Sequence, residues 1–270
     1  MNDDSLTCGS IFSGIGGLDL GFEEEGFETL WQIEKDPACR TRLKKRFPYA
    51  EQFEDVFDVD GRSLRPVSVI HGGFPCQPFA TVGKRKGDKD DRFLWPEMRR
   101  IIEQNEPEWV VAENVPGILT GKLEAVFETI CRSLEELSFE VWPVILPTLS
   151  VDGPTIRERV FIIARNRKNS QRRIRNLADA PVESSKRTRG DAPTGRSRPE
   201  RIVYPSRLRA VVRTGSPGES GIVWPDEPRV GRMAYGVPDR LDRLGAIGNA
   251  VCPILARVLA QGIKHAINTD

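Results

Sequence analysis

The sequence predicts an open α/β sheet whose ligands bind at the carboxyl ends of its strands. Short apolar runs typical of buried strands end in glycines, prolines or acids, and amphipathic helices separate some of them. These runs are Leu6–Phe12, Thr29–Ile33, Val67–Ile70 and Trp109–Ala112. In open α/β sheets the loops that follow the strands meet in one crevice, so the residues after each run are the candidates for function.

Composition limits the class of protein. The chain has 270 residues, 39% hydrophobic and 29% charged, which suits one globular domain with a smaller lobe. No apolar run approaches the about 18 residues of a membrane span, and Met1–Thr7 lacks a signal-peptide pattern, so we expect a cytoplasmic protein. The cysteines stand too far apart for a disulfide framework or zinc site, which leaves room for one reactive thiol; they are Cys8, Cys39, Cys76, Cys131 and Cys252.

The first strand, Leu6–Phe12, runs directly into Ser13-Gly14-Ile15-Gly16-Gly17. Glycines there let the backbone approach a ligand and let a helix begin abruptly. Glu34 ends the second strand twenty residues after Gly14, where an acid binds ribose hydroxyls in dinucleotide folds. The glycines do not spell the dinucleotide fingerprint, so we expect another adenosine-containing ligand. Asp55 is a third candidate contact, or a simple loop acid.

The third strand, Val67–Ile70, is closed by Gly72-Gly73 and leads to a cysteine between two prolines, in Phe74-Pro75-Cys76-Gln77-Pro78. The prolines fix φ on both sides, so the thiol is held on a stiff loop. Cys76 is either a reactive thiol or a buried structural cysteine. Residues 81–91 then form a mobile basic flap or a solvated turn, with Lys84, Arg85, Lys86 and Lys89.

A second polar group follows another strand. Phe93–Glu103 has the apolar spacing of a helix, and Trp109–Ala112 after it ends in Glu113-Asn114-Val115-Pro116. A carboxylate at this strand end faces the same crevice as Cys76 if both strands belong to one sheet. This convergence is the main indication of an active site.

The remaining elements complete the domain. Lys122–Ser138 is predicted as an amphipathic helix with a core face of Leu123, Val126, Phe127, Ile130, Leu134 and Leu137. A turn carrying Arg157-Glu158-Arg159 joins the strands Val141–Leu146 and Val160–Ala164. The last helix, Val251–Ile263, follows Gly248-Asn249-Ala250 and turns inward Ile254, Leu255, Val258 and Leu259.

Charge divides unevenly along the chain. The segment Arg165–Arg213 holds fifteen Lys and Arg against four Asp and Glu, or +11, so the rest carries about −10 of the total +1. An acidic body with a basic arm is the expected footprint of a protein that contacts phosphates. The alternative is a solvated basic loop without a partner.

Five motifs in this order resemble the DNA (cytosine-5) methyltransferases, in particular their short bacterial and phage-type members: Phe12-Ser13-Gly14-Ile15-Gly16-Gly17, Pro75-Cys76-Gln77, Glu113-Asn114-Val115, Arg157-Glu158-Arg159 and Gly248-Asn249-Ala250-Val251. The resemblance spans about residues 6–165 and 224–265. It implies a Rossmann-like S-adenosylmethionine-dependent methyltransferase domain in residues 1–165 and a small, basic, partly disordered target-recognition lobe in residues 166–235. Residues 236–270 would return a helix to pack beside the first strand.

The resemblance also implies roles. Cys76 would add to C6 of a cytosine flipped out of duplex DNA, Glu113 would hydrogen-bond N3 and the 4-amino group, Arg159 would hold O2, and Arg157 would support the site. The methyl donor would be bound by Phe12, Gly14, Gly16, Gly17, Glu34, Asp55, Leu94, Asn249 and Val251. The substrate would be contacted by Pro75, Gln77, Lys84, Arg85 and Asn114.

The same resemblance implies a monomer acting on double-stranded DNA, with a cognate restriction endonuclease as a possible partner. Two other classes stay open: a DNA-binding protein that has kept the fold without turnover, and an RNA methyltransferase of similar chemistry. A thiol-redox protein fits poorly because no second cysteine is placed to resolve a disulfide with Cys76.

Overall fold

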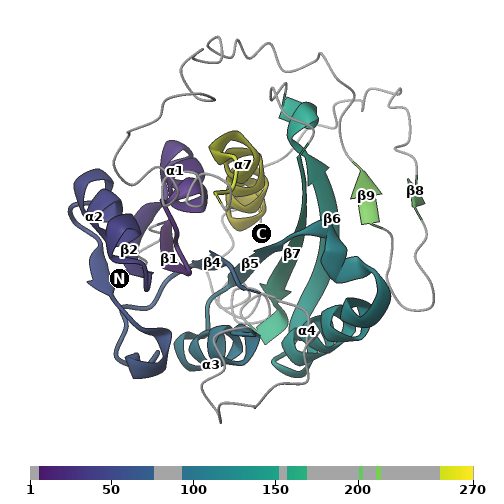
Figure 1. The fold of residues 1–270 in the computed structure, drawn as a ribbon, viewed down its shortest axis with the longest axis horizontal. Helices are drawn as coiled ribbons and strands as arrows, with labels where there is room; N and C mark the ends of the chain where they lie inside the picture. Colours follow the sequence, from purple (N-terminus) through teal and green to yellow (C-terminus); the bar gives the residue numbers. More distant parts are fainter. Residues whose placement is uncertain are drawn as a thin grey trace, which may run out of the picture.

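One sheet carries the predicted strands and aligns their carboxyl ends (Figure 1). The structure is a computed structural model that describes residues 6–75, 93–151, 157–168, 201–202, 211–213 and 250–269. Within these residues nine strands follow the order β3-β2-β1-β4-β5-β7-β6-β9-β8. Five neighbouring strands are parallel: β1 (Thr7–Ile11), β2 (Glu28–Ile33), β3 (Glu51–Phe53), β4 (Val69–Gly73) and β5 (Trp109–Asn114).

Antiparallel pairing extends the sheet beyond β5. Strand β7 (Glu158–Asn166) runs antiparallel to both β5 and β6 (Phe139–Pro147). Two short strands lie beyond β6, namely β9 (Val211–Arg213) and β8 (Arg201–Ile202). The α/β fold with an open, largely parallel sheet is therefore confirmed.

Helices cover both faces of the sheet (Figure 1). The helices α1 (Gly17–Glu24) and α7 (Pro253–Thr269) share one core with Cys8 of β1, and α3 (Trp95–Asn105) and α4 (Glu124–Glu136) pack on the other face. The helix α2 (Pro37–Arg46) follows β2. The short 3-10 helices are η1 (Val56–Asp58), η2 (Pro116–Leu119), η3 (Gly121–Leu123) and η4 (Thr148–Val151). No helix in the described part of the chain has both the length and the apolar character that crossing a bilayer demands.

The final helix returns to the start of the fold, as the resemblance implied. A Cβ added to Gly21 of α1 would lie 2.5 Å from the Cβ of Ala256, so the two helix backbones approach closely. Leu255 and Leu259 are buried as predicted, but Val258 is 49% exposed and its predicted inward placement is wrong. The buried face is centred between Leu255 and Ala256, which turns Val258 to solvent because each helical residue rotates by about 100°.

Several boundaries also differ from the predictions. Gly72 and Gly73 do not close the third strand but lie within β4, where a Cβ at Gly72 would collide with the carbonyl oxygen of Ile11. Glu158 and Arg159 lie in β7 rather than in a turn, because they continue the ladder opposite Pro147 and Leu146. The amphipathic helix is confirmed as α4, with Phe127, Ile130 and Leu134 fully buried.

Candidate active site

The carboxyl ends of β4 and β5 bring together the residues on either side of the candidate thiol loop. In the parallel ladder Gly73 pairs with Glu113, and Asn114 follows as the last residue of β5. Pro75 lies two residues beyond Gly73 and precedes Cys76 directly. Cys76 itself lies outside the described residues, as do Gln77, Lys84, Arg85 and Asn249. The convergence of the Cys76 thiol with Glu113 therefore stays a prediction, supported by this register.

Glu113 forms a buried ion pair with Arg159. The Nε of Arg159 lies 2.7 Å from Oε1 of Glu113, and the two side chains are only 14% and 9% exposed. The antiparallel ladder explains the contact, since Glu113 pairs with Phe161 and Arg159 is two residues away on the same face of the sheet. The Nη1 of Arg159 also donates to the carbonyl oxygen of Glu158 at 2.8 Å, which orients the guanidinium.

This environment changes the acidity of Glu113. Burial raises the pKa of Glu113 to about 7, although the positive charges of Arg159 and Arg157 act in the opposite direction. Burial also lowers the pKa of Arg157, and the like charge of Arg159 lowers it further. A carboxyl with a pKa near neutrality exchanges a proton readily at physiological pH, so it can both donate and accept hydrogen bonds.

Asn114 anchors the chain that leads to Cys76. Its Nδ2 donates to the carbonyl oxygen of Phe74 at 2.9 Å, while its Oδ1 accepts from the amide of Val115. The Phe74 ring is buried edge-on against Trp95 at a centroid distance of 5.2 Å. The segment entering the thiol loop is thus held by both its backbone and its side chain. The sequence predicted Asn114 as a substrate contact and did not indicate this anchoring role.

Gly73 leaves the space that the Glu113 carboxylate occupies. A Cβ at Gly73 would lie 2.7 Å from Oε2 of Glu113, closer than real Cβ contacts. We expect Gly73→Ala to shift the carboxylate away from Arg159 and to lower the rate of the methyl transfer that the resemblance implies about tenfold to a hundredfold, since misplacement by about 1 Å costs that much. Single-turnover transfer rates measure the effect. Gly117→Ala is the matched control, because Gly117 is exposed and its nearest neighbour, Val115, would lie 4.0 Å away. Equal rates for the two variants would contradict this role of Gly73.

A second group of candidates lies at the ends of β1, β2 and β3. The chain turns sharply after β1, with positive φ at Phe12 (58°), Gly14 (57°) and Gly16 (83°). Oε2 of Glu34 accepts from the Gly14 amide at 2.7 Å, which ties the glycine loop to the end of β2. Asp55 caps η1 by accepting from the amide of Phe57 at 3.1 Å. The three strand ends are neighbours in the sheet, so these residues line one edge.

The glycine loop has the form of a cradle for a ligand. A Cβ at Gly14 would meet no atom of the described chain within 4 Å, so open space adjoins this backbone. Gly16 caps α1 without a side-chain hydrogen bond, which leaves the positive end of the helix dipole available to an anionic group. An adenosyl amino acid, with its carboxylate and ribose hydroxyls, fits this combination of donors and the Glu34 acceptor.

The start of α7 connects the two groups of candidates. A Cβ at Gly17 would collide with the carbonyl oxygen of Val251, so this chain lies against the first turn of α1. Cys252, the next residue, is within electrostatic reach of Arg157. Leu94, the remaining described candidate, is 9% exposed immediately before α3. Gly17 and Val251 thus put part of the candidate cofactor site on the face of the sheet that carries α1 and α7, whereas Phe12 packs against the core on the face of α3 and α4.

One buried network near the glycine loop was not predicted from the sequence. Asp19 of α1 is fully buried, and its carboxylate accepts from Oγ of Ser10 at 3.1 Å and from Nε2 of Gln32 at 2.7 Å. Burial raises the pKa of Asp19 to about 6, and these hydrogen bonds limit the rise. An acid between Leu18 and Phe22, on the apolar face of a short helix, was the available signal.

Comparison with known proteins agrees with this geometry. Residues 6–202 match the model of the family described as C-5 cytosine-specific DNA methylase. Type II methyltransferase M1.ScrFI of Lactococcus lactis subsp. cremoris is 33% identical over 183 residues, covering 66% of this chain and 46% of that protein. Type II methyltransferase M.PspPI of Psychrobacter sp. is 35% identical over 163 residues, covering 59% and 39%. The chain thus spans about half the length or less of these two relatives.

Solved structures share the fold. A candidate DNA modification methyltransferase encoded within a prophage of E. coli aligns with a TM-score of 0.53 at 27% identity, over 62% of this chain and 48% of that one. Spodoptera frugiperda DNMT2 aligns with a TM-score of 0.50 at 24% identity, over 60% and 50% of the two chains, which supports the fold alone. Since the family model covers residues 6–202 of the 270, including both groups of candidate residues at the strand ends, the chain belongs to the C-5 cytosine-specific DNA methylase family.

Proposed function

We propose that this protein transfers a methyl group from S-adenosylmethionine to C5 of cytosine in double-stranded DNA. The observation that carries the proposal is the buried Glu113–Arg159 pair, which stands beside the strand leading to Pro75 and Cys76 in a chain of this family. A carboxyl and a guanidinium at 2.7 Å present donors and an acceptor to the polar edge of one base.

Cytosine C5 is too weak a nucleophile to take a methyl group directly. The Cys76 thiolate attacks C6, forming a carbon–sulfur bond and moving the electron pair of the C5–C6 double bond toward C5 and N3. C5 then forms a bond to the methyl carbon of the donor while the bond from that carbon to the sulfonium sulfur breaks, which leaves S-adenosylhomocysteine. Removal of the C5 proton by a base afterwards restores the double bond and expels the thiolate, so the enzyme returns to its initial state.

Glu113 and Arg159 stabilise this addition. Negative charge develops at N3 and O2 as sulfur adds, so a protonated Glu113 donates to N3 while its other oxygen accepts from the 4-amino group. Arg159 donates to O2 of the base and holds the Glu113 carboxyl in place. The Glu113 pKa of about 7 supports this role, because a substantial fraction of the carboxyl is protonated at physiological pH.

The glycine loop and its neighbours hold the methyl donor. S-adenosylmethionine, when bound, supplies an electrophilic methyl group. Its pocket is lined by Phe12, Gly14, Gly16 and Gly17. Glu34 binds the ribose hydroxyls and Asp55 binds the adenine amine. Leu94 and the chain at Asn249 to Val251 complete the pocket. The open space at Gly14 and the uncapped start of α1 support this assignment.

The target base must leave the duplex, because C6 is inaccessible in stacked DNA. The basic flap at residues 81–91, with Lys84 and Arg85, and the segment Arg165–Arg213 supply charge for the phosphates on both sides of the gap. Residues 166–235 form the target-recognition lobe in this proposal, between the catalytic residues 1–165 and the returning residues 236–270. The relatives named above are Type II methyltransferases, so a restriction endonuclease is a candidate partner. In this proposal the enzyme acts as a monomer in the cytoplasm.

The test is a transfer assay with S-adenosylmethionine labelled with tritium in its methyl group. The full chain is incubated with double-stranded DNA, with the same DNA containing 5-methylcytosine in place of cytosine, and with RNA of the same sequence. We expect label in the first substrate, as 5-methylcytosine identified by mass spectrometry, and none in the second. Label confined to RNA, or found as a methylated exocyclic amine, would overturn the proposal. Bisulfite sequencing of the modified DNA then identifies the target sequence.

A further inference from the structure

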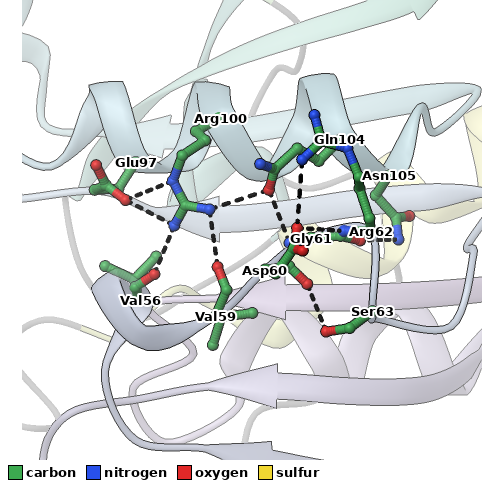
Figure 2. A network of polar contacts seen from close by, with 10 residues as sticks. All are labelled: Val56, Val59, Asp60, Gly61, Arg62, Ser63, Glu97, Arg100, Gln104 and Asn105. Carbon is green, nitrogen blue, oxygen red and sulfur yellow. Dashed lines mark hydrogen bonds and ion pairs between the residues drawn. The ribbon is translucent and has the colours of Figure 1, made fainter.

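The connection between β3 and β4 is tied to one face of α3. It begins with Asp55, which caps η1, and continues past Val59 and Gly61 (Figure 2). Arg100, on α3, points its guanidinium toward this connection. Its Nη2 donates to the carbonyl oxygen of Val56 and its Nη1 to that of Val59, both at 2.8 Å. One side chain therefore holds the backbone of η1 at its first residue and just beyond its last.

The guanidinium is itself immobilised. Its Nε donates to Oε2 of Glu97 at 2.8 Å, Nη2 lies 2.7 Å from the same oxygen, and Nη1 donates to Oε1 of Gln104 at 3.0 Å. With the two carbonyl oxygens these acceptors satisfy all five donors of an arginine. A lysine cannot reproduce this arrangement, because its three donors radiate from one nitrogen.

Two neighbouring residues of α3 extend the attachment. Oε1 of Gln104 also accepts from the Gly61 amide at 2.8 Å, and Asn105 donates to the carbonyl oxygen of Gly61 (Figure 2). Asn105 also accepts from the Val67 amide. Arg99, in contrast, pairs with Glu103 and Glu136, on α3 and α4. Within the described residues, the arginine that binds η1 is thus Arg100 and not its neighbour.

The position of the Asp55 carboxylate depends on this attachment. Its Oδ1 accepts from the amide of Phe57, the central residue of the helix that Arg100 holds. Its Oδ2 lies 3.8 Å from Nζ of Lys35, beyond hydrogen-bonding distance, and the side chain is 29% exposed. Asp55 can therefore present one oxygen to an amine in the pocket, in a direction that the η1 backbone sets.

We propose that Arg100 is a positioning residue for adenine recognition: it fixes η1 so that Asp55 accepts from the 6-amino group of the methyl donor. The inference rests on the proposed function, because it assumes that the pocket binds an adenosyl group. It adds to that function a remote determinant of specificity on α3. This helix also follows the proposed basic flap in the chain, with Leu94 as its N-cap.

The experiment compares two ligands that differ at one group. S-adenosylhomocysteine carries the 6-amino group, whereas S-inosylhomocysteine carries a carbonyl oxygen that the Asp55 carboxylate repels. Calorimetry on the full chain gives both dissociation constants. We expect the wild type to prefer the adenosyl ligand by about tenfold or more, the worth of one hydrogen bond to a charged group. Arg100→Met should lose most of this preference, because it should bind the adenosyl ligand more weakly and the inosyl ligand as tightly as before. The preference of Arg100→Lys should lie between those of the wild type and Arg100→Met.

Arg99→Met is the matched control and should keep the preference of the wild type. Thermal unfolding of each variant shows whether it is folded; if Arg100→Met is not, Glu97→Ala removes the acceptor that anchors the guanidinium and should reduce the preference in the same direction. If Arg100→Met binds both ligands more weakly by the same factor, Arg100 has only a structural role. If the variant keeps the wild-type preference, Arg100 does not position Asp55. Either result overturns the inference while the proposed function stands. A wild type that binds neither ligand overturns both.

Discussion

Cys76→Ala is expected to abolish methyl transfer while leaving DNA binding intact. Without the sulfur no bond to C6 forms, and C5 stays unreactive, so the rate should fall by about 10⁴-fold or more, as when other enzymes lose their nucleophile. DNA affinity should change little, because phosphate contacts supply most of it. Transfer of a tritiated methyl group and fluorescence anisotropy of labelled duplex measure the two quantities separately.

A chemical trap sharpens this prediction. In DNA containing 5-fluorocytosine the final step cannot occur, since fluorine does not leave as a cation, so the wild type should stay covalently bound and resist denaturation. Cys131→Ala is the control, because burial raises the pKa of the Cys131 thiol to about 12 and leaves it un-ionised. If Cys76→Ala still forms the adduct, or the control does not, Cys76 is not the nucleophile.

Glu113→Gln is expected to slow transfer by about a hundredfold to ten-thousandfold, the usual contribution of a proton donor that acts in the transition state. Glutamine keeps the shape of the side chain, can still accept from Arg159 and can donate a hydrogen bond to N3, but its amide cannot transfer a proton to N3. Because burial raises the pKa of Glu113 to about 7, the wild-type rate should fall as pH rises above neutrality. The variant should lose this pH dependence, which rate measurements from pH 6 to 9 would show.

The same substitution should stabilise the protein at high pH. The folded pKa of Glu113, about 7, exceeds its ordinary value of 4.5, so this group contributes stability below pH 4.5 that is lost as pH rises to 7. The loss is on the order of 3 kcal/mol, from about 1.4 kcal/mol per unit of pKa. In urea unfolding, the free energy of unfolding of Glu113→Gln minus that of the wild type should therefore increase between pH 5 and pH 8.

Glu106→Gln serves as the control, because it removes one negative charge from an exposed position at the end of α3. A gain that is the same at every pH would mean that Glu113 does not carry the raised pKa. If both results are found, the buried Glu113 carboxyl promotes catalysis and also lowers the stability of the fold at the pH where the enzyme works.

Local sequence determined the elements and their order. Apolar runs and helical spacing are short-range properties, so the strand before Glu34, the strand before Glu113 and the helix Glu124–Glu136 were all predicted within a few residues. The glycine loop after β1 was predicted for the same reason, and its backbone has the positive φ angles that glycine permits. Motif order likewise identified the family to which the chain belongs.

The tertiary structure decided which of these residues meet. Arg159 was expected in a turn, yet β7 pairs antiparallel with β5 and brings its guanidinium to 2.7 Å from Glu113. The roles of Gly73 and Arg100 depend on residues about forty positions away in the chain, because Gly73 adjoins Glu113 and Arg100 binds the backbone of Val56. A raised pKa also follows from burial, which is a property of the packed core. Strand and helix patterns are written in neighbouring residues, whereas register and burial depend on contacts between distant segments, and those exist only in the folded chain.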